Sequence, residues 1–264
     1  MNILYIGDVM GETGVRLLEE LLPGLRHEKS VDVVIAQAEN VTNGKGMSVA
    51  DYRRLRRAGV DGFTGGNHTT VLDELYPLLS DPAVPVTCPA NMPDCPGPSF
   101  KYVGPADRRV LIVSILGQIV GKDAARPVTH PLHTVDSILE SQKNEPHAAT
   151  IINFHGDYSS EKVVFGYYLD GRVTAVIGDH WHVPTADAMV LPKGTAHQTD
   201  VGMCGSIDSS LGVKLEIVID RWKNGILNRN ELETTGRRQF NALLVRADDA
   251  SGLARSVEAI NLVL

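Results

Sequence analysis

The sequence predicts an α/β fold, in which short apolar strands alternate with amphipathic helices. Apolar runs such as Asn2–Ile6 and Val31–Ala36 have the length of buried strands and end in polar or glycine residues. Between these two runs, leucines recur at helical spacing at positions 17, 18, 21, 22 and 25. Ligand-type polar residues directly follow several of the strands, and open α/β sheets place their binding sites at those ends.

Composition narrows the class of protein. The chain has 264 residues, 43% hydrophobic and 22% charged, which is an ordinary globular balance with enough apolar material for a full core. No apolar run approaches the roughly 18 to 20 residues that span a membrane. The formal net charge of -7 disfavours a long nucleic acid as partner. An anionic substrate would instead be attracted locally, and bound cations could do this.

Cysteine usage and the N-terminus bear on the compartment. Cys88, Cys95 and Cys204 form no CxxC pair, and their number is odd. The chain starts with the apolar strand that follows Met1, without a basic segment or a cleavage site. We therefore expect reduced thiols and a cytoplasmic protein.

The first half of the chain is expected to contain three strands and three helices. The strands are expected at Asn2–Ile6, Val31–Ala36 and Val60–Thr64, and the helices after the loop Gly11–Gly14, at Val49–Ala58 and at Val71–Leu79. Ser48 is a candidate N-cap and Gly59 a candidate C-cap of the second helix. Six prolines make Asp81–Pro98 an irregular connection, with one short strand around Val84–Val86.

The second half is expected to continue the alternation and then to change character. Strands are expected at Arg109–Leu116, Thr150–Phe154, Val173–Ile177 and Ala188–Leu191, with helices at Thr134–Lys143 and Glu161–Leu169. In the tail, strands are expected at Val213–Arg221, Arg238–Ala247 and Val257–Leu264. We interpret residues 1–264 as one domain, in which residues 206–240 form an antiparallel flap or edge insertion.

Two histidines in one short stretch, His180 and His182, are the first candidate metal ligands. They follow the strand Val173–Ile177, so that two neutral nitrogen ligands can converge on one small volume. Other strand ends supply Asp8, Glu39 with Asn40, Asn67 with His68, and His155. A two-metal hydrolase needs one bridging carboxylate and several oxygen and nitrogen ligands, and this set provides both.

Each of these residues alone also has a simpler explanation. Asp8 could cap a turn, Asn67 could occupy a left-handed turn position, and His155 could be a half-buried histidine with satisfied hydrogen bonds. Their recurrence at strand ends favours a single composite site along one edge of a sheet.

The order and spacing of these motifs resemble a known superfamily. Gly7-Asp8, Glu39-Asn40, Gly66-Asn67-His68, His155 and His180-x-His182 resemble the calcineurin-like metallophosphoesterases. The stretches Gln37–Asn40, Thr185–Asp187 and Thr199–Met203 are similar to its YmdB-like bacterial branch. The resemblance implies a sandwich of two central β-sheets flanked by helices, with a dimetal site at the carboxyl ends of the strands.

The resemblance also implies a role for each site residue. Asp8, Asn40 and His182 would bind the first metal, Asn67, His155 and His180 the second, and Glu39 would bridge them. His68 would act as general acid, and a hydroxide that bridges the metals would attack phosphorus. The cofactors would be two divalent or trivalent ions of iron, manganese or zinc.

Several positions distinguish this chain. Met10 and Glu39 depart from the wider superfamily and match the YmdB-like branch. Gly156-Asp157, Asp179 and Trp181 depart from the branch itself. Asp179 is a candidate hydrogen-bond partner for an imidazole. Trp181 is the candidate substrate contact, because its indole could narrow the pocket or stack on a base.

The resemblance implies hydrolysis of small phosphodiesters, with 2′,3′- or 3′,5′-cyclic nucleoside monophosphates as the substrate class. Three alternatives stay open at this point: a phosphomonoesterase or nuclease on the same site, a regulatory protein that senses nucleotides with slow turnover, and a non-catalytic scaffold without metal. A homo-oligomer is also possible.

Overall fold

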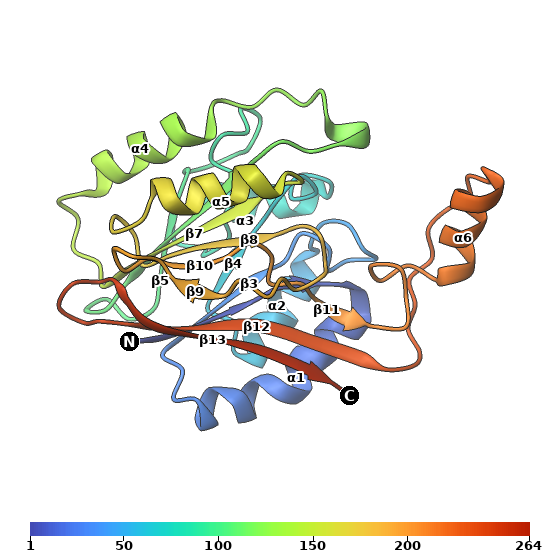
Figure 1. Ribbon diagram of the computed structural model, residues 1–264, viewed down its shortest axis with the longest axis horizontal. Helices are drawn as coiled ribbons and strands as arrows, with labels where there is room; N and C mark the ends of the chain where they lie inside the picture. Colours follow the sequence, from blue (N-terminus) through green and yellow to red (C-terminus); the bar gives the residue numbers. More distant parts are fainter.

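The computed structural model describes residues 1–264, apart from the side chain of Lys122. Two β-sheets pack face to face, and helices cover both outer faces (Figure 1). In chain order the elements are β1 (Asn2–Ile6), β2 (Asp8–Val9), α1 (Gly11–Glu28), β3 (Val33–Gln37), α2 (Val49–Ala58), β4 (Gly62–Thr64), the 3-10 turn η1 (Asp73–Leu75), α3 (Tyr76–Ser80), β5 (Lys101–Val103), β6 (Val110–Leu116), the 3-10 turn η2 (Gly121–Asp123), α4 (Pro131–Gln142), β7 (Ala149–His155), α5 (Ser159–Tyr168), β8 (Ala175–Asp179), β9 (Met189–Val190), β10 (Ala196–Gln198), β11 (Met203–Ser206), α6 (Leu215–Asn224), β12 (Arg238–Ala247) and β13 (Ala254–Val263).

Both sheets contain a block of parallel strands. The first sheet has the order β2-β11-β12-β1-β3-β4, with β13 beside β12. Its strands β1, β3 and β4 run parallel to one another. The second sheet has the order β5-β6-β7-β8-β10-β9, and its strands β6, β7, β8 and β10 are parallel. Parallel strands place their carboxyl ends at a common edge, which prepares a composite site.

Three apolar layers hold the sandwich together. In β1 the alternation of side chains sends Ile3 and Tyr5 into the layer between the sheets, and Leu4 and Ile6 toward α1 and α2. Strands of the second sheet pack their other faces against α4 and α5. The predicted α/β sandwich of two central sheets flanked by helices is therefore confirmed.

The helix termini are only partly as predicted. Ser48 caps α2 by accepting a hydrogen bond from Asp51 N at 3.0 Å, and Gly59 ends it with φ +108°, both as expected. The loop predicted at Gly11–Gly14 is wrong, because these residues form the first turn of α1. A Cβ on Gly14 would lie 2.5 Å from the carbonyl oxygen of Cys204, so close packing explains this glycine.

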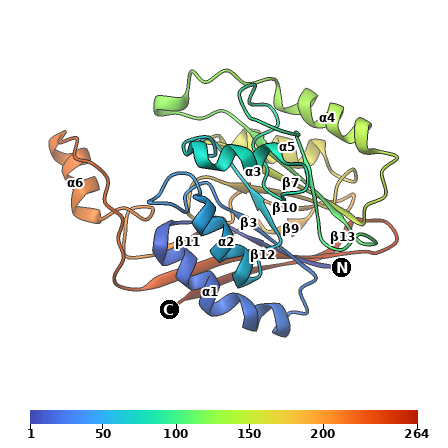
Figure 2. The same cartoon turned by 180° about the vertical axis from the view of Figure 1, so that it is seen from behind.

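The predicted strand at Val213–Arg221 is also wrong, because most of this segment belongs to α6. The β-branched residues of this segment favour a strand, but its apolar positions recur at helical spacing, at Leu215, Val218, Ile219 and Trp222. All ten residues of α6 are at least partly exposed, and the helix projects from the body (Figures 1 and 2). The description of residues 206–240 as an insertion in a single domain stays a prediction.

The cysteines do not follow the expectation of three reduced thiols. Cys88 and Cys95 form a disulfide, and Cys204 is free and buried. The proline-rich connection folds back between the two cysteines so that their Cα atoms are 5.9 Å apart, which suits a disulfide. Among the described residues, no helix has the length and apolar character needed to cross a membrane.

Candidate functional site

The ends of five parallel strands bring all eight predicted ligand and catalytic residues to one place. Asp8 follows β1 after a single glycine, and His155 is the last residue of β7. Glu39 and Asn40 come shortly after β3, and Asn67 and His68 shortly after β4. The two remaining histidines come directly after β8. The converging residues are Asp8, Glu39, Asn40, Asn67, His68, His155, His180 and His182.

One half of the site consists of Asp8, Asn40 and His182. Asn40 Nδ2 lies 3.2 Å from Asp8 Oδ1 and 3.3 Å from His182 Nε2. His182 Nε2 lies 3.8 Å from Asp8 Oδ1. The Asn40 amide therefore presents its nitrogen to the other two groups, and binding a metal through Oδ1 requires the amide to turn.

The other half consists of Asn67, His155 and His180. Asn67 Oδ1 lies 2.9 Å from His155 Nε2, and its Nδ2 donates to Asp123 Oδ2 at 2.7 Å, which directs the amide oxygen inward. The rings of His155 and His180 pack with their centroids 4.5 Å apart. One potential ligand atom from each of Glu39, His155 and His180 lies within 4.8 Å of the others.

Glu39 contacts both halves. Its Oε1 lies 3.2 Å from His155 Nε2 and 3.5 Å from Asn40 Nδ2. Its Oε2 accepts a hydrogen bond from His68 N at 2.8 Å. Glu39 therefore lies between the two groups of potential ligands.

The electrostatics of the site favour a cation. Burial, followed by repulsion from Asp179, raises the pKa of Asp8 well above its usual value. Burial opposes a charge on His155, yet Glu39 and Asp179 raise its pKa well above the usual value. Burial and repulsion from His155 lower the pKa of His180 to about 4, so this imidazole is uncharged at pH 7. A bound cation would favour the ionised form of Asp8 and the neutral form of His155, and carboxylates beside neutral imidazoles form a donor set that suits a transition metal.

Comparison with known proteins shows the family of this chain. Residues 4–260 match the family model described as YmdB-like protein. The chain belongs to the YmdB-like family. It is 35% identical over 263 residues to the 2′,3′-cyclic-nucleotide 2′-phosphodiesterase of Bacillus subtilis (strain 168), with 98% of this chain and 96% of the relative covered.

Solved structures support the same assignment. The crystal structure of a novel phosphatase from Mycoplasma pneumoniae matches with a TM-score of 0.91 and 30% identity, over 100% of this chain and 93% of that one. The 5′-nucleotidase precursor from Thermus thermophilus matches with a TM-score of 0.59 and 12% identity, over 100% of this chain and 54% of that one, and shows the fold alone.

A buried polar network in this YmdB-like protein orients His155. Its Nδ1 lies 2.6 Å from Asp179 Oδ1, which confirms that Asp179 is a hydrogen-bond partner of an imidazole. Asp179 Oδ2 in turn accepts hydrogen bonds from Tyr5 at 2.8 Å, from Gln37 at 3.1 Å and from Asn153. Carboxylates in this position fix the tautomer of a metal-binding histidine.

The structure places His68 at the edge of the site. Its side chain is 23% exposed, and its Nδ1 lies 2.9 Å from Asn40 Oδ1. Because Nδ1 faces Asn40, Nε2 is the ring nitrogen available to a substrate. Trp181 instead donates its indole N–H to the carbonyl oxygen of Asp157 at 3.1 Å. A contact between Trp181 and the substrate stays a prediction.

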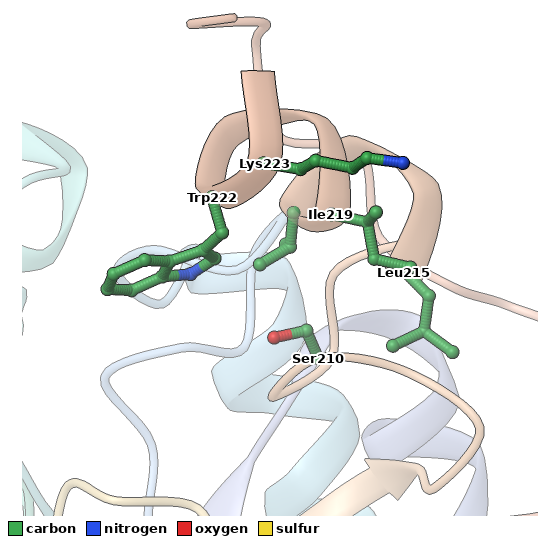
Figure 3. A pocket seen from close by; sticks show the side chains of 6 residues that line it. Ser210, Leu215, Ile219, Trp222 and Lys223 are labelled. Atoms are coloured by element: carbon green, nitrogen blue, oxygen red, sulfur yellow. The ribbon is translucent and has the colours of Figure 1, made fainter. Parts of the chain in front are cut away.

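An apolar hollow lies elsewhere in the structure, on α6. It has a volume of about 420 Å³ and is lined by residues that include Leu215, Ile219 and Trp222 (Figure 3). Its lining lacks the carboxylates and imidazoles that converge at the strand ends, so we assign the function to the strand-end site.

Gly66 provides a test of the site geometry. A Cβ at this position would lie 2.4 Å from Glu39 Oε2 and 2.5 Å from His155 Cδ2. We therefore expect Gly66→Ala to displace both side chains and to lower the affinity for Mn²⁺ about tenfold or more, measured by isothermal titration calorimetry. The matched control is Gly24→Ala, where a Cβ would have open space. Wild-type affinity in Gly66→Ala would contradict this account.

Proposed function

We propose that this protein is a dimetal-dependent phosphodiesterase that hydrolyses small phosphodiesters, with cyclic nucleoside monophosphates (2′,3′ or 3′,5′) as its substrate class. The observation that carries the proposal is the position of Glu39, which contacts both groups of potential ligands. The family and the names of its characterised relatives support a phosphoester hydrolase. The 2′,3′-cyclic-nucleotide activity named for the Bacillus subtilis relative supports the substrate class.

The residues present fit two metal ions. Asp8, Asn40 and His182 would hold one ion, and Asn67, His155 and His180 the other, with Glu39 shared between them. The mixed nitrogen and oxygen donors suit iron, manganese or zinc. When bound, the ions would neutralise phosphate charge and lower the pKa of bound water, so that hydroxide is available near neutral pH.

The side chains of this chain orient the proposed metal ligands and move the proton. Asn67 is held by Asp123 and His155 by Asp179, so both ligands keep their direction when the substrate binds. His68, with Nε2 free, is placed to donate a proton to the leaving alkoxide as general acid. The leaving group of a cyclic nucleotide is a sugar alkoxide, which is strongly basic and therefore leaves faster when it is protonated.

A substrate panel tests the proposal. Protein reconstituted with Mn²⁺ is assayed with bis-p-nitrophenyl phosphate, p-nitrophenyl phosphate, 2′,3′-cyclic AMP and 3′,5′-cyclic AMP. We expect hydrolysis of the diesters and of at least one cyclic nucleotide. Activity on the monoester alone would replace the proposal with a phosphomonoesterase, and binding of cyclic nucleotides without turnover would favour a sensing protein.

A further inference from the structure

A buried ion pair lies directly behind the turn that carries His180 and His182. Lys162 of α5 and Asp200, which follows β10, are both 0% exposed, and their Nζ and Oδ2 atoms are 2.9 Å apart. Taking two charges out of water is costly, and a buried pair contributes little net stability. The pair therefore needs an explanation other than stability.

The turn beside this pair has an unfavourable backbone conformation. His180 has φ +108° and His182 has φ +63°, both in the region that favours glycine. Such strain persists only where the surrounding structure enforces it, and it is concentrated at functional sites. Two such residues within three positions require specific contacts to hold them.

The ion pair supplies those contacts on both sides of His180. Lys162 Nζ donates a hydrogen bond to the carbonyl oxygen of Asp179 at 2.7 Å. Asp200 Oδ2 accepts one from the backbone N–H of Trp181 at 2.9 Å. The peptide groups before and after His180 are thereby fixed to the same two charged atoms.

Asp200 also fixes the segment that supports Asp8. Its Oδ1 accepts a hydrogen bond from Gly202 N at 2.9 Å. Gly202 O accepts one from Asp8 N at 3.0 Å, and Met203 N donates to His182 O at 3.2 Å. The buried Lys162–Asp200 pair is thus connected through backbone hydrogen bonds to three predicted ligands on two segments of the chain, namely Asp8, His180 and His182.

Trp181 covers the pair. Its ring lies over Lys162 with Nζ 4.0 Å from the ring centroid, and its indole N–H is bonded to Asp157 O. A cation over an aromatic face is stabilised electrostatically, more so when water is excluded. The residue between the two histidines is therefore tied to Lys162 by its side chain and to Asp200 by its backbone.

We propose that Lys162 and Asp200 are positioning residues, which hold the turn from His180 to His182 in the conformation that both metal ions require. The inference rests on the proposed function, because it concerns the affinity of the same site for its metals. It also gives a role to Thr199–Met203, one of the stretches in which the sequence resembles the YmdB-like branch.

The experiment compares two lysine-to-methionine variants. Lys162→Met removes the charge behind the turn. The control, Lys101→Met, removes another buried lysine, which donates to the carbonyl oxygens of Leu79 and Asp81 in a different part of the fold. Mn²⁺ is titrated into chelator-treated protein by calorimetry, electron paramagnetic resonance follows the coupling between the two ions, and the melting temperature of the metal-free protein is recorded.

We expect Lys162→Met to bind Mn²⁺ about tenfold to a hundredfold more weakly and to lose the coupled signal. Lys101→Met is expected to keep wild-type affinity for Mn²⁺, even if its melting temperature falls as much as that of Lys162→Met. Wild-type affinity in Lys162→Met, or equal weakening in Lys101→Met, would overturn the inference. Should Lys162→Met fail to fold, the double variant Lys162→Met/Asp200→Asn is used, because it also removes the carboxylate that would be left buried and unpaired. Wild-type Mn²⁺ affinity in the double variant would overturn the inference.

The wild-type titration separates this inference from the function on which it rests. Fewer than two Mn²⁺ bound per wild-type chain would overturn the proposed function and the inference with it. Two ions bound equally tightly by wild type and Lys162→Met would overturn the inference alone.

Discussion

Replacing Glu39 with glutamine is expected to weaken Mn²⁺ binding at both metal positions and to lower phosphodiester turnover about a thousandfold. The reason is that Glu39 contacts both groups of potential ligands, so its charge would support both proposed ions. Metal ions supply several kcal/mol of transition-state stabilisation, and each 1.36 kcal/mol is about tenfold in rate. Metal content after equilibrium dialysis and kcat/KM with bis-p-nitrophenyl phosphate are the two measurements.

Single replacements of the histidines provide the comparison for Glu39. His180→Ala and His182→Ala are each expected to remove mostly one metal, because the two side chains lie in different halves of the site. A Glu39→Gln variant that loses one ion and keeps the other at wild-type affinity would show that Glu39 is not a bridge.

Replacing His68 with alanine is expected to separate catalysis from metal binding. We expect kcat for a cyclic nucleotide to fall by about 10²- to 10⁴-fold, the usual contribution of general acid–base catalysis, while two metals stay bound. The loss should be smaller for bis-p-nitrophenyl phosphate, because p-nitrophenolate leaves without protonation. Steady-state kinetics with both substrates, together with metal analysis, measure this difference.

The control for His68→Ala is His27→Ala, which changes an exposed histidine at the end of α1. An equal loss with both substrates would exclude a general-acid role and favour a role of His68 in holding Asn40 or the phosphate. In cells, loss of turnover with the cellular effect intact would favour the sensing role over the enzyme.

Much of the site could be predicted because its parts are local. Each candidate residue follows an apolar strand within a few positions, and parallel strands bring their carboxyl ends together. The end of β8 is less local: the apolar run stops at Ile177, but the strand continues through Asp179. Asp179 is thereby fixed in the sheet, which suits its contact with His155.

The features that the sequence does not predict depend on contacts between residues that are distant in sequence. Tyr5 of the first sheet contacts Asp179 of the second, and Lys162 of α5 contacts Asp200, which follows β10. In the sequence, Tyr5 is only an apolar position facing inward, and Lys162 is only a polar residue on a helix. The sequence does not predict the helix α6, because its β-branched run also fits a strand. It does not predict the Cys88–Cys95 disulfide either, because that bond depends on how an irregular segment folds back.

The most direct test of the proposed two-metal phosphodiesterase activity is a titration of activity with metal. Chelator-treated wild-type protein receives Mn²⁺ in increments, and the rate of bis-p-nitrophenyl phosphate hydrolysis is recorded at each ratio of metal to chain. We expect no measurable rate without metal and a rate that saturates at two equivalents. Full activity in the metal-free protein, or saturation at one equivalent, would contradict it.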